Sequence, residues 1–430
     1  MNNTVKIELW GMTVGYLIWD KSNWRTETSV FKFDSDFLSK ELDISPLRMS
    51  IYSPLSVTGL PLRGGRPKDE FRGLPPVFAD SLPDHWGNSI FRAWAKEQKM
   101  SLRGFTPVDL LSFVGKRAMG ALEYMPAIIR DEDDAFDVDV EKLYSFAKEV
   151  LEEKSVPEYS SDRELLWQDL VKLGTPPGGK RPKALIAVNP ESSVIKSGQA
   201  VLPPGWKYYI LKYDNESDSF PYARMEYAYY KMCLAAGIEM MHSELRTFST
   251  ASHFITERFD RNETGKVHVQ SLLAMTGGAD SYEDAFDVLR RLKMNYGDYE
   301  QLYRRMVFNV IAGNIDDHAR NFSFLMDRIG RWSLAPAYDM VYSIDPSVLD
   351  VQKGQFLSIN GKKNDITEED LVAVGRRYDI NRPGEIIRNT LDVVSRIHDY
   401  MRECGVADRV YDMISGELNE KYRSLKAIVR

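Results

Sequence analysis

Short apolar segments separated by turns fill the first third of the chain and predict β-strands. Lys6–Trp10 and Val14–Trp19 are rich in strand-forming residues, and Gly11 between them suits a tight turn. Val30–Phe33 and Ala121–Met125 are further segments of this kind. The beginning of the chain is therefore expected to be β-rich.

The middle of the chain combines strand patterns with one helix. Ala184–Val188, Trp206–Tyr213 and Phe254–Phe259 are apolar and strand-like. Met225–Ala236 is dense in Ala, Met, Leu and Tyr, and Gly237 is a natural helix stop.

Helical spacing of apolar residues dominates after about residue 280. Asp284–Met294 and Tyr299–Ala312 follow it, Thr367 begins a further helix with an acidic first turn, and two amphipathic helices flank Gly405. The pattern predicts an α+β chain with a β-rich N-terminal lobe and an all-α C-terminal lobe, the layout of a two-lobed phosphotransferase. The acidic run Asp131–Asp134 marks one domain boundary.

Composition limits the class of protein. The chain has 430 residues, 43% hydrophobic content, two cysteines and a formal net charge of −7. Few cysteines fit a reducing, cytoplasmic compartment, and no apolar run reaches the roughly 20 residues that span a membrane. The first residues do not have the form of a secretory signal. An acidic chain is not expected to bind DNA by itself, although a partner protein could supply the DNA contacts.

The strongest chemical signal is the polar loop that follows the helix at Tyr299–Ala312. Asp316 and Asn321 are five positions apart, the spacing of Asp and Asn in kinase catalytic loops. Phosphoryl transfer needs a carboxylate to orient the attacking hydroxyl and oxygen ligands for Mg²⁺. Asp316 is therefore the predicted catalytic acid.

A hairpin then leads to a second acid. Phe322–Met326 and Trp332–Ala335 flank the turn Asp327–Arg331 and predict two paired strands. The return strand delivers Asp339 beside the catalytic loop, where Asp339 and Asn321 would bind Mg²⁺.

Other readings of these residues stay open. Each acid alone could simply cap a helix or a turn. His318 is expected to hold the loop by hydrogen bonds, with contact to an ATP phosphate as the alternative, and Asp317 is expected to face solvent.

An ATP site also needs a cation near the phosphates and a backbone edge for adenine. Lys212 ends an apolar strand, and Glu226 in the following helix is placed to pair with it. Glu257 and Phe259 lie where the β-rich region gives way to the helical one, as a hinge would. A solvent-facing lysine and an ordinary edge strand are the competing interpretations.

A Gly-rich segment precedes the strand Ala184–Val188. Gly178 and Gly179 permit close backbone approach, and Lys180 and Lys183 suit an anion. The segment is not a Walker A loop, since no Gly-Lys-Ser/Thr and no following helix occur. A generic Gly/Pro loop is an equal alternative.

Taken in order, these pieces resemble the HipA family of toxin kinases. The likeness extends over some 260 residues and rests on Phe78–Asp84, Leu110–Gly115 with Gly120-Ala121, Gly178–Ala184, Ile210–Lys212, Glu226-Tyr227, Thr256–Arg261, Asp316–Asn321 and Ala335–Asp339.

The resemblance implies a kinase-like fold with an added N-terminal subdomain over 1–130, a nucleotide-binding β-rich region over 131–260 and a helical lobe over 261–430. It also implies an ATP- and Mg²⁺-dependent protein Ser/Thr kinase. By the same resemblance, Lys212 is the lysine that contacts ATP, and residues 178–183 form the loop that binds the ATP phosphates. The partner would be a HipB-like helix-turn-helix antitoxin that carries the DNA contacts. The protein substrate would be translation-related, for example an aminoacyl-tRNA synthetase, with growth arrest as the outcome.

One departure from the family concerns a serine that is autophosphorylated ahead of the phosphate loop. Here Thr175 is the only hydroxyl close by, so either Thr175 takes that role or self-inactivation is absent. Two rival functions remain. One is a lipid or small-molecule kinase with a related Asp-x-His-x-x-Asn loop, and the other is a catalytically silent antitoxin-binding corepressor.

Overall fold

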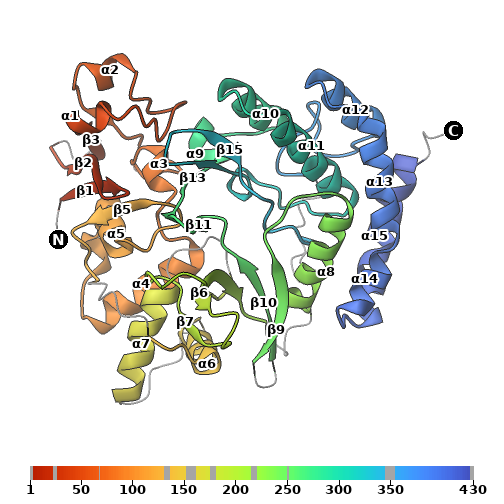
Figure 1. Cartoon of the computed structure of the whole chain (residues 1–430), viewed down its shortest axis with the longest axis horizontal. Coiled ribbons are helices and arrows are strands. Elements are labelled where there is room, and N and C mark those ends of the chain that lie inside the picture. The colour runs from red at the N-terminus through yellow and green to blue at the C-terminus, as the bar shows by residue number, and fades with distance from the viewer. Residues whose placement is uncertain are drawn as a thin grey trace. The chain divides into compact units, whose positions relative to one another are not determined.

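The computed structural model describes residues 3–22, 27–66, 68–129, 136–151, 161–174, 181–214, 220–248, 251–343 and 354–426. The strands form two five-stranded sheets, in the orders β4-β3-β2-β1-β5 and β7-β6-β8-β10-β9, a two-stranded sheet β11-β12 and a three-stranded sheet β13-β14-β15 (Figure 1). The strands are β1 (Thr4–Leu9), β2 (Met12–Asp20), β3 (Thr28–Phe33), β4 (Leu62–Arg63), β5 (Leu122–Met125), β6 (Lys183–Val188), β7 (Ile195–Ser197), β8 (Lys207–Lys212), β9 (Ser243–Phe248), β10 (Ala251–Glu257), β11 (Arg261–Asn262), β12 (Gly265–Lys266), β13 (His268–Ser271), β14 (Ser323–Met326) and β15 (Trp332–Leu334).

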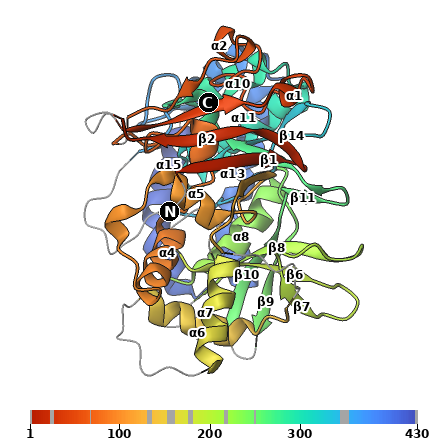
Figure 2. The same ribbon diagram turned by 90° about the vertical axis from the view of Figure 1, so that its left-hand side faces the viewer.

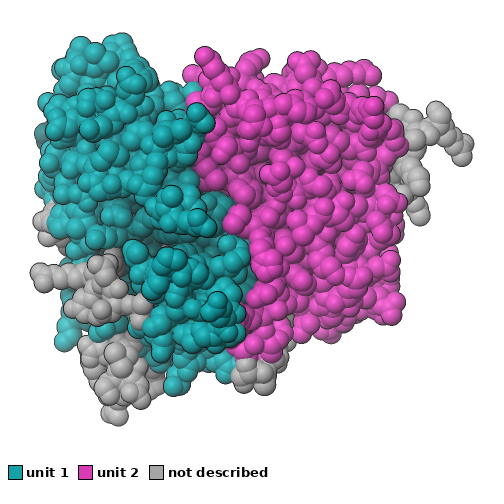
Figure 3. Space-filling model, in the orientation of Figure 1, with its two compact units in different colours: residues 1–213, 255–270, 326–331 teal, residues 214–254, 271–325, 332–430 magenta. Residues whose placement is uncertain are grey.

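The chain divides into two compact units that interleave along the sequence (Figure 3). The first unit comprises Met1–Tyr213, Ile255–Gln270 and Met326–Arg331, and the second comprises Asp214–Phe254, Ser271–Leu325 and Trp332–Arg430.

Alternation builds the first sheet of the first unit. In β1, Val5, Ile7 and Leu9 are fully buried, as expected of a strand with one face on a core. Figure 2 shows β1 and β2 side by side, and α5 packs against β1, β2 and β5. The helices of this unit are α1 (Ser35–Leu38), α2 (Pro54–Val57), α3 (Pro76–Ala79), α4 (His85–Glu97), η1 (Leu102–Gly104), α5 (Pro107–Val114), α6 (Val140–Leu151) and α7 (Ser161–Gly174).

The second sheet has a strand with no exposed face. Every residue of β6 is buried, because β6 lies between β7 and β8 and helix α7 packs on it. Such burial on both faces explains the nearly continuous apolar sequence of this strand.

Helices dominate the second unit, which also carries β9, β15 and most of β10 and β14. Ser281, Asn295 and Thr367 each begin a helix with a capping box, in which the cap side chain and an aspartate three residues later exchange hydrogen bonds with the backbone. The helices are α8 (Tyr222–Ala235), α9 (Leu272–Thr276), α10 (Tyr282–Arg291), α11 (Tyr296–Ile311), η2 (Ala319–Asn321), α12 (Glu368–Arg377), α13 (Pro383–Ser395), α14 (Ile397–Glu403) and α15 (Asp408–Lys426).

The strand and helix predictions are confirmed with shifts of a few residues, including the hairpin β14–β15. The helices α4, α6 and α7 were not predicted from the sequence. The acidic run at 131–134 lies outside the described residues, and the division into three domains stays a prediction. No helix in the described part of the chain is long and apolar enough to cross a membrane.

Candidate active site

A left-handed glycine at the end of α11 begins the predicted catalytic loop. Gly313 has φ of +72°, and the Tyr229 hydroxyl donates to the carbonyl of Ala312 at 2.6 Å. A Cβ at position 313 would lie 3.0 Å from the Tyr342 ring. Glycine therefore lets the chain turn sharply out of the helix without the strain that a side chain would bring.

The loop is closed by its own asparagine. The Asn321 side-chain nitrogen donates to the Asp316 carbonyl at 2.7 Å, and the Asn321 backbone nitrogen donates to the His318 carbonyl at 2.8 Å. The structure thus brings Asp316 and Asn321 together. Because the amide nitrogen is engaged, a metal ion would bind Asn321 through its side-chain oxygen.

Asp339 lies five residues beyond the end of β15, in a left-handed backbone conformation with φ of +52°. The segment is fixed just before it, because the Ala337 nitrogen donates to the Glu239 carbonyl at 2.8 Å. Non-glycine residues in this conformation are uncommon and cluster at functional sites, and aspartate is among those that tolerate it.

Asn314 and Ser343 join the segments that carry the two acids. The Asn314 side-chain nitrogen is 3.5 Å from the Asp339 carbonyl, at the long limit of a hydrogen bond. The Asn314 side-chain oxygen accepts from the Ser343 hydroxyl at 2.6 Å, and that hydroxyl accepts from the Asp316 backbone nitrogen at 3.1 Å. Asp316 and Asp339 are therefore tied to one small polar network. The sequence analysis did not single out Asn314 or Ser343.

Asp317 is not solvent-facing, and that prediction is wrong. Its exposed fraction is 1%, and it accepts from the Tyr282 hydroxyl at 2.7 Å, from the Gln355 side-chain nitrogen at 2.9 Å and from the Phe356 backbone nitrogen at 2.7 Å. These donors come from segments 35 to 39 residues away in sequence. The local polar pattern therefore could not reveal them.

Burial raises the pKa of Asp317 to about 6, although the hydrogen bonds that it accepts act in the opposite direction. Burial and the charge of Asp317 raise the pKa of Tyr282 well above its usual range, so that this hydroxyl stays a donor. Tyr282 also accepts from the Asn309 side chain at 2.8 Å. Asp317 therefore anchors the predicted catalytic loop to α10 and to the segment at Gln355, and through Tyr282 to Asn309 of α11.

His318 lies at the rim of the loop. Its ring packs edge-on against Phe356 with centroids 5.7 Å apart, and its Nε2 is 3.9 Å from an Asp316 carboxylate oxygen. The side chain is 36% exposed. This placement is compatible with holding the loop and with reaching a phosphate.

The donor set fits a magnesium ion that keeps water and phosphate ligands. The described residues contain no group of three or more His, Cys, Asp or Glu side chains able to hold a metal. Mg²⁺ in phosphotransferases is usually held by one or two protein oxygens together with substrate phosphates. Asp339 and Asn321 would supply two such oxygens.

In the first unit, two lysines face each other across neighbouring strands. Lys183 of β6 and Lys212 of β8 are direct antiparallel partners, and Lys183 is only 4% exposed. Paired residues of a ladder project from the same face of the sheet, and like charges directly opposite destabilise a sheet. The pairing therefore places two basic side chains on one face of the sheet.

The predicted hinge is attached to the same sheet. The Arg258 backbone nitrogen donates to the Tyr208 carbonyl at 2.8 Å, and the Glu257 carboxylate accepts from Lys207 at 3.2 Å. Phe259 follows in the same segment and is half-buried.

Two groups of predicted site residues are not brought together with the rest by the described structure. Thr175, Gly178, Gly179 and Lys180 lie outside the described residues. Glu226 belongs to α8 of the second unit and Lys212 to the first, so the ion pair between them stays a prediction.

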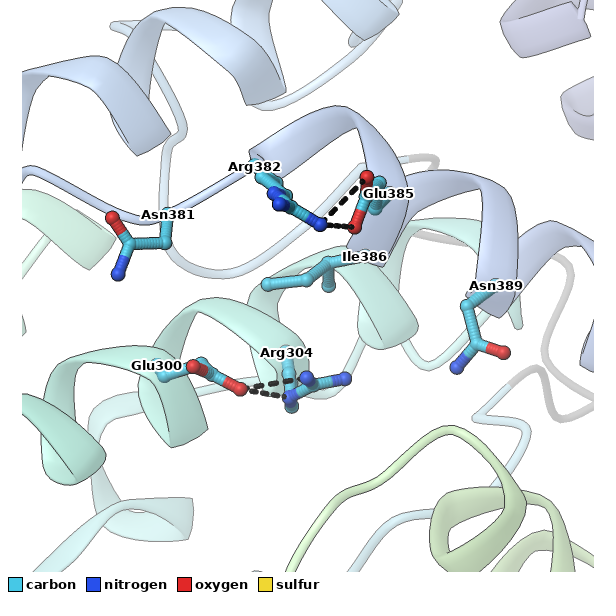
Figure 4. Close-up of a pocket in the computed structure, with 7 residues that line it drawn as sticks. All are labelled: Glu300, Arg304, Asn381, Arg382, Glu385, Ile386 and Asn389. Atoms are coloured by element: carbon cyan, nitrogen blue, oxygen red, sulfur yellow. Dashed lines mark hydrogen bonds and ion pairs between the residues drawn. The ribbon is translucent and has the colours of Figure 1, made fainter.

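A cavity of about 350 Å³ lies on the second unit, away from every predicted site residue. Figure 4 shows it between α11 and the beginning of α13, where two Arg–Glu pairs and two asparagines surround Ile386. The Arg304–Glu300 pair has a distance of 2.6 Å, and Arg304 also donates to the Ala236 carbonyl at the end of α8. Its arginines are thus already used within the fold.

Comparison with known proteins identifies related sequences and folds. The family model of the HipA N-terminal domain matches residues 5–125, and that of the HipA-like C-terminal domain matches residues 175–400. The curated protein "Putative kinase Y4mE" of Sinorhizobium fredii is 24% identical over 186 residues, which are 39% of this chain and 42% of the relative. A "Putative kinase" of Haemophilus influenzae is 27% identical over 190 residues, 39% of this chain and 52% of the relative. The chain thus spans about half the length of these curated relatives.

A solved structure has a similar fold over its whole length. HipA of Shewanella oneidensis, determined with HipB and operator DNA, superposes with a TM-score of 0.67 and 15% identity, covering 99% of this chain and 98% of that one. This likeness confirms the predicted α+β, kinase-like fold class.

Proposed function

The chain belongs to the HipA family, and from that premise we propose that it is an ATP- and Mg²⁺-dependent protein Ser/Thr kinase. The observation that carries the proposal is the loop in which Asn321 closes on Asp316 while Asn314 and Ser343 join it to Asp339. One catalytic carboxylate and two metal-binding oxygens are the minimum that this chemistry asks of a protein.

Each residue has a distinct role in the proposed reaction. Asp316 orients the acceptor hydroxyl and takes its proton as the oxygen attacks the γ-phosphorus of ATP. Asn321 and Asp339 would hold Mg²⁺, which neutralises the charge on the transferred phosphoryl group and on the leaving ADP. Asp317 holds the loop in place through the hydrogen bonds of its buried side chain with Tyr282 and Phe356.

The nucleotide is assigned to the first unit. Lys212 and Lys183 would bind the phosphates, since they are direct partners on neighbouring strands and both are cationic. Residues 178–180 would complete the phosphate loop. Glu257 and Phe259 would offer backbone groups to adenine, and Glu226 would pair with Lys212 in the active form.

We further infer a toxin role with a HipB-like helix-turn-helix antitoxin as partner. The similar Shewanella protein was determined with HipB and operator DNA, and the net charge of −7 favours DNA contacts made through the partner. A translation-related protein, such as an aminoacyl-tRNA synthetase, is the proposed substrate, and Thr175 the proposed site of self-phosphorylation.

The test is transfer of labelled phosphate from ATP, with Mg²⁺, to proteins of a cell extract. Asp316→Asn should abolish the label, whereas Asp392→Asn, the same change on the exposed face of α13, should not. Phosphoamino-acid analysis should give phosphoserine or phosphothreonine. Label confined to lipid or small molecules would support a lipid or small-molecule kinase, and no label in any fraction would support a silent corepressor.

A further inference from the structure

A buried ion cluster begins inside the predicted hinge, at Arg258, and is not used by the proposed chemistry. Asp260 is fully buried and Arg258 is 1% exposed. Two nitrogens of Arg258 donate to the two oxygens of Asp260, each at 2.8 Å. Arg261 donates to Asp260 at 2.8 Å as well. One carboxylate therefore holds two guanidinium groups inside the first unit.

The same carboxylate reaches into the N-terminal part of the chain. The backbone nitrogen of Gly120 donates to Asp260 at 2.7 Å, and Arg261 donates to the Gly120 carbonyl at 3.3 Å. Gly120 has φ of +80°, and a Cβ there would lie 3.0 Å from the Val269 nitrogen. The turn at 120 is thus shaped so that its backbone can touch Asp260.

Burial alone would raise the pKa of Asp260, but the charges of Arg258 and Arg261 outweigh it and hold that pKa far below its usual range. The cluster is therefore charged at every physiological pH. The side chains of such a buried cluster are held firmly in place, because the loss of one partner would leave the other charges buried and unpaired.

The cluster is adjacent to the atoms assigned to adenine. Arg258 stands between Glu257 and Phe259, and its backbone nitrogen is bound to Tyr208 in β8, the strand that ends at Lys212. Fixing the Arg258 side chain from one side and its backbone from the other leaves this segment little freedom to shift along β8.

We propose that Asp260 is a positioning residue for the nucleotide, which ties the adenine-binding segment 257–259 to the N-terminal turn at Gly120. The inference rests on the proposed function, because it assigns a role in ATP binding. It adds a part for the N-terminal region, namely that ATP affinity depends on a turn about 140 residues away in sequence.

The experiment compares full-length wild type, Asp260→Asn and Glu123→Gln, with KM for ATP and kcat measured separately. Glu123 pairs with Lys266 at 2.8 Å on the edge of the same region but does not touch Asp260. Asp260→Asn should raise KM for ATP about tenfold and change kcat less than about threefold, as expected when a supporting hydrogen-bond partner of a binding group is lost. Glu123→Gln should leave both constants near wild type.

The measurements distinguish failure of this inference from failure of the proposed kinase function. Wild type that neither binds nor uses ATP overturns both. Active wild type with a folded Asp260→Asn whose KM is unchanged, or whose kcat alone falls, overturns the inference and spares the kinase. Should Asp260→Asn fail to fold, Arg261→Lys decides by the same criteria, since it keeps the charge but removes the guanidinium nitrogen that donates to both Asp260 and the Gly120 carbonyl.

Discussion

Replacing Asp317 by asparagine is expected to change the stability of the protein little at neutral pH but to disturb the geometry of the proposed catalytic loop. The substitution keeps the size of the side chain but removes its charge and one of its two acceptor oxygens. Three donors, from Tyr282, Gln355 and Phe356, converge on this group. An asparagine must therefore direct its own NH₂ group at one of them, and a buried donor left unpaired costs about 1–3 kcal/mol.

The ionisation of Asp317 acts in the other direction. Its pKa rises from 3.8 to about 6 on folding, which corresponds to about 3 kcal/mol. Because the folded pKa is the higher one, this contribution to stability is fully present below about pH 4 and is lost as the pH rises through about 6. The wild type thus carries the full desolvation penalty at pH 7.5, and the asparagine variant carries none.

The two effects predict a pH-dependent difference between the proteins. At pH 7.5 the free energies of unfolding should agree within about 2 kcal/mol. Lowering the pH to 5 should increase the stability of wild type relative to Asp317→Asn by about 1.4 kcal/mol. The kcat for phosphoryl transfer at pH 7.5 should fall about 10- to 100-fold, because the loop that carries Asp316 shifts.

Urea unfolding at both pH values and steady-state kinetics measure these quantities, with Asp392→Asn as the exposed control. Parallel pH dependence of stability in wild type and Asp317→Asn would show that residue 317 is not a buried titrating group. Full activity in the folded variant would show that the loop does not depend on this anchor.

Three further changes have defined outcomes. Tyr282→Phe removes one donor to Asp317 and should lower stability by about 1–3 kcal/mol and reduce kcat, as measured by urea unfolding and turnover. Gly313→Ala combines a positive φ with a 3.0 Å contact to Tyr342 and should lower the free energy of unfolding by about 1–3 kcal/mol, as measured by urea unfolding. His268 is fully buried with its pKa lowered to about 4, chiefly by burial. Stability should therefore fall as the pH drops from about 6.5 towards 4, and His268→Gln should flatten that decline in acid-unfolding curves.

Local order in the sequence was enough to predict the backbone of the site. Asp316 and Asn321 share one short loop, and a two-stranded hairpin separates them from Asp339. Spacing and turn chemistry therefore determine their neighbourhood. The helix start at Thr367 was equally local, since the cap and its partner Asp370 are three residues apart.

The supporting contacts could not be predicted, because they depend on distant segments. From the sequence, Asp317 looks like an ordinary polar loop residue, because its contacts with Tyr282 and Gln355 exist only in the folded chain. Likewise, nothing in the sequence around Gly120 points to Asp260, its partner 140 positions later. Such pairs become visible only when the fold brings buried donors and acceptors together.

The left-handed backbone at Asp339 bears on how an inactive protein should be made. Asparagine adopts this conformation readily, whereas alanine is penalised there by about 1 kcal/mol. Asp339→Ala would therefore alter both the charge and the local chain path, and a loss of growth inhibition could not be attributed to one of them. Asp339→Asn changes the charge while retaining the bend, and is the better reference for experiments in cells.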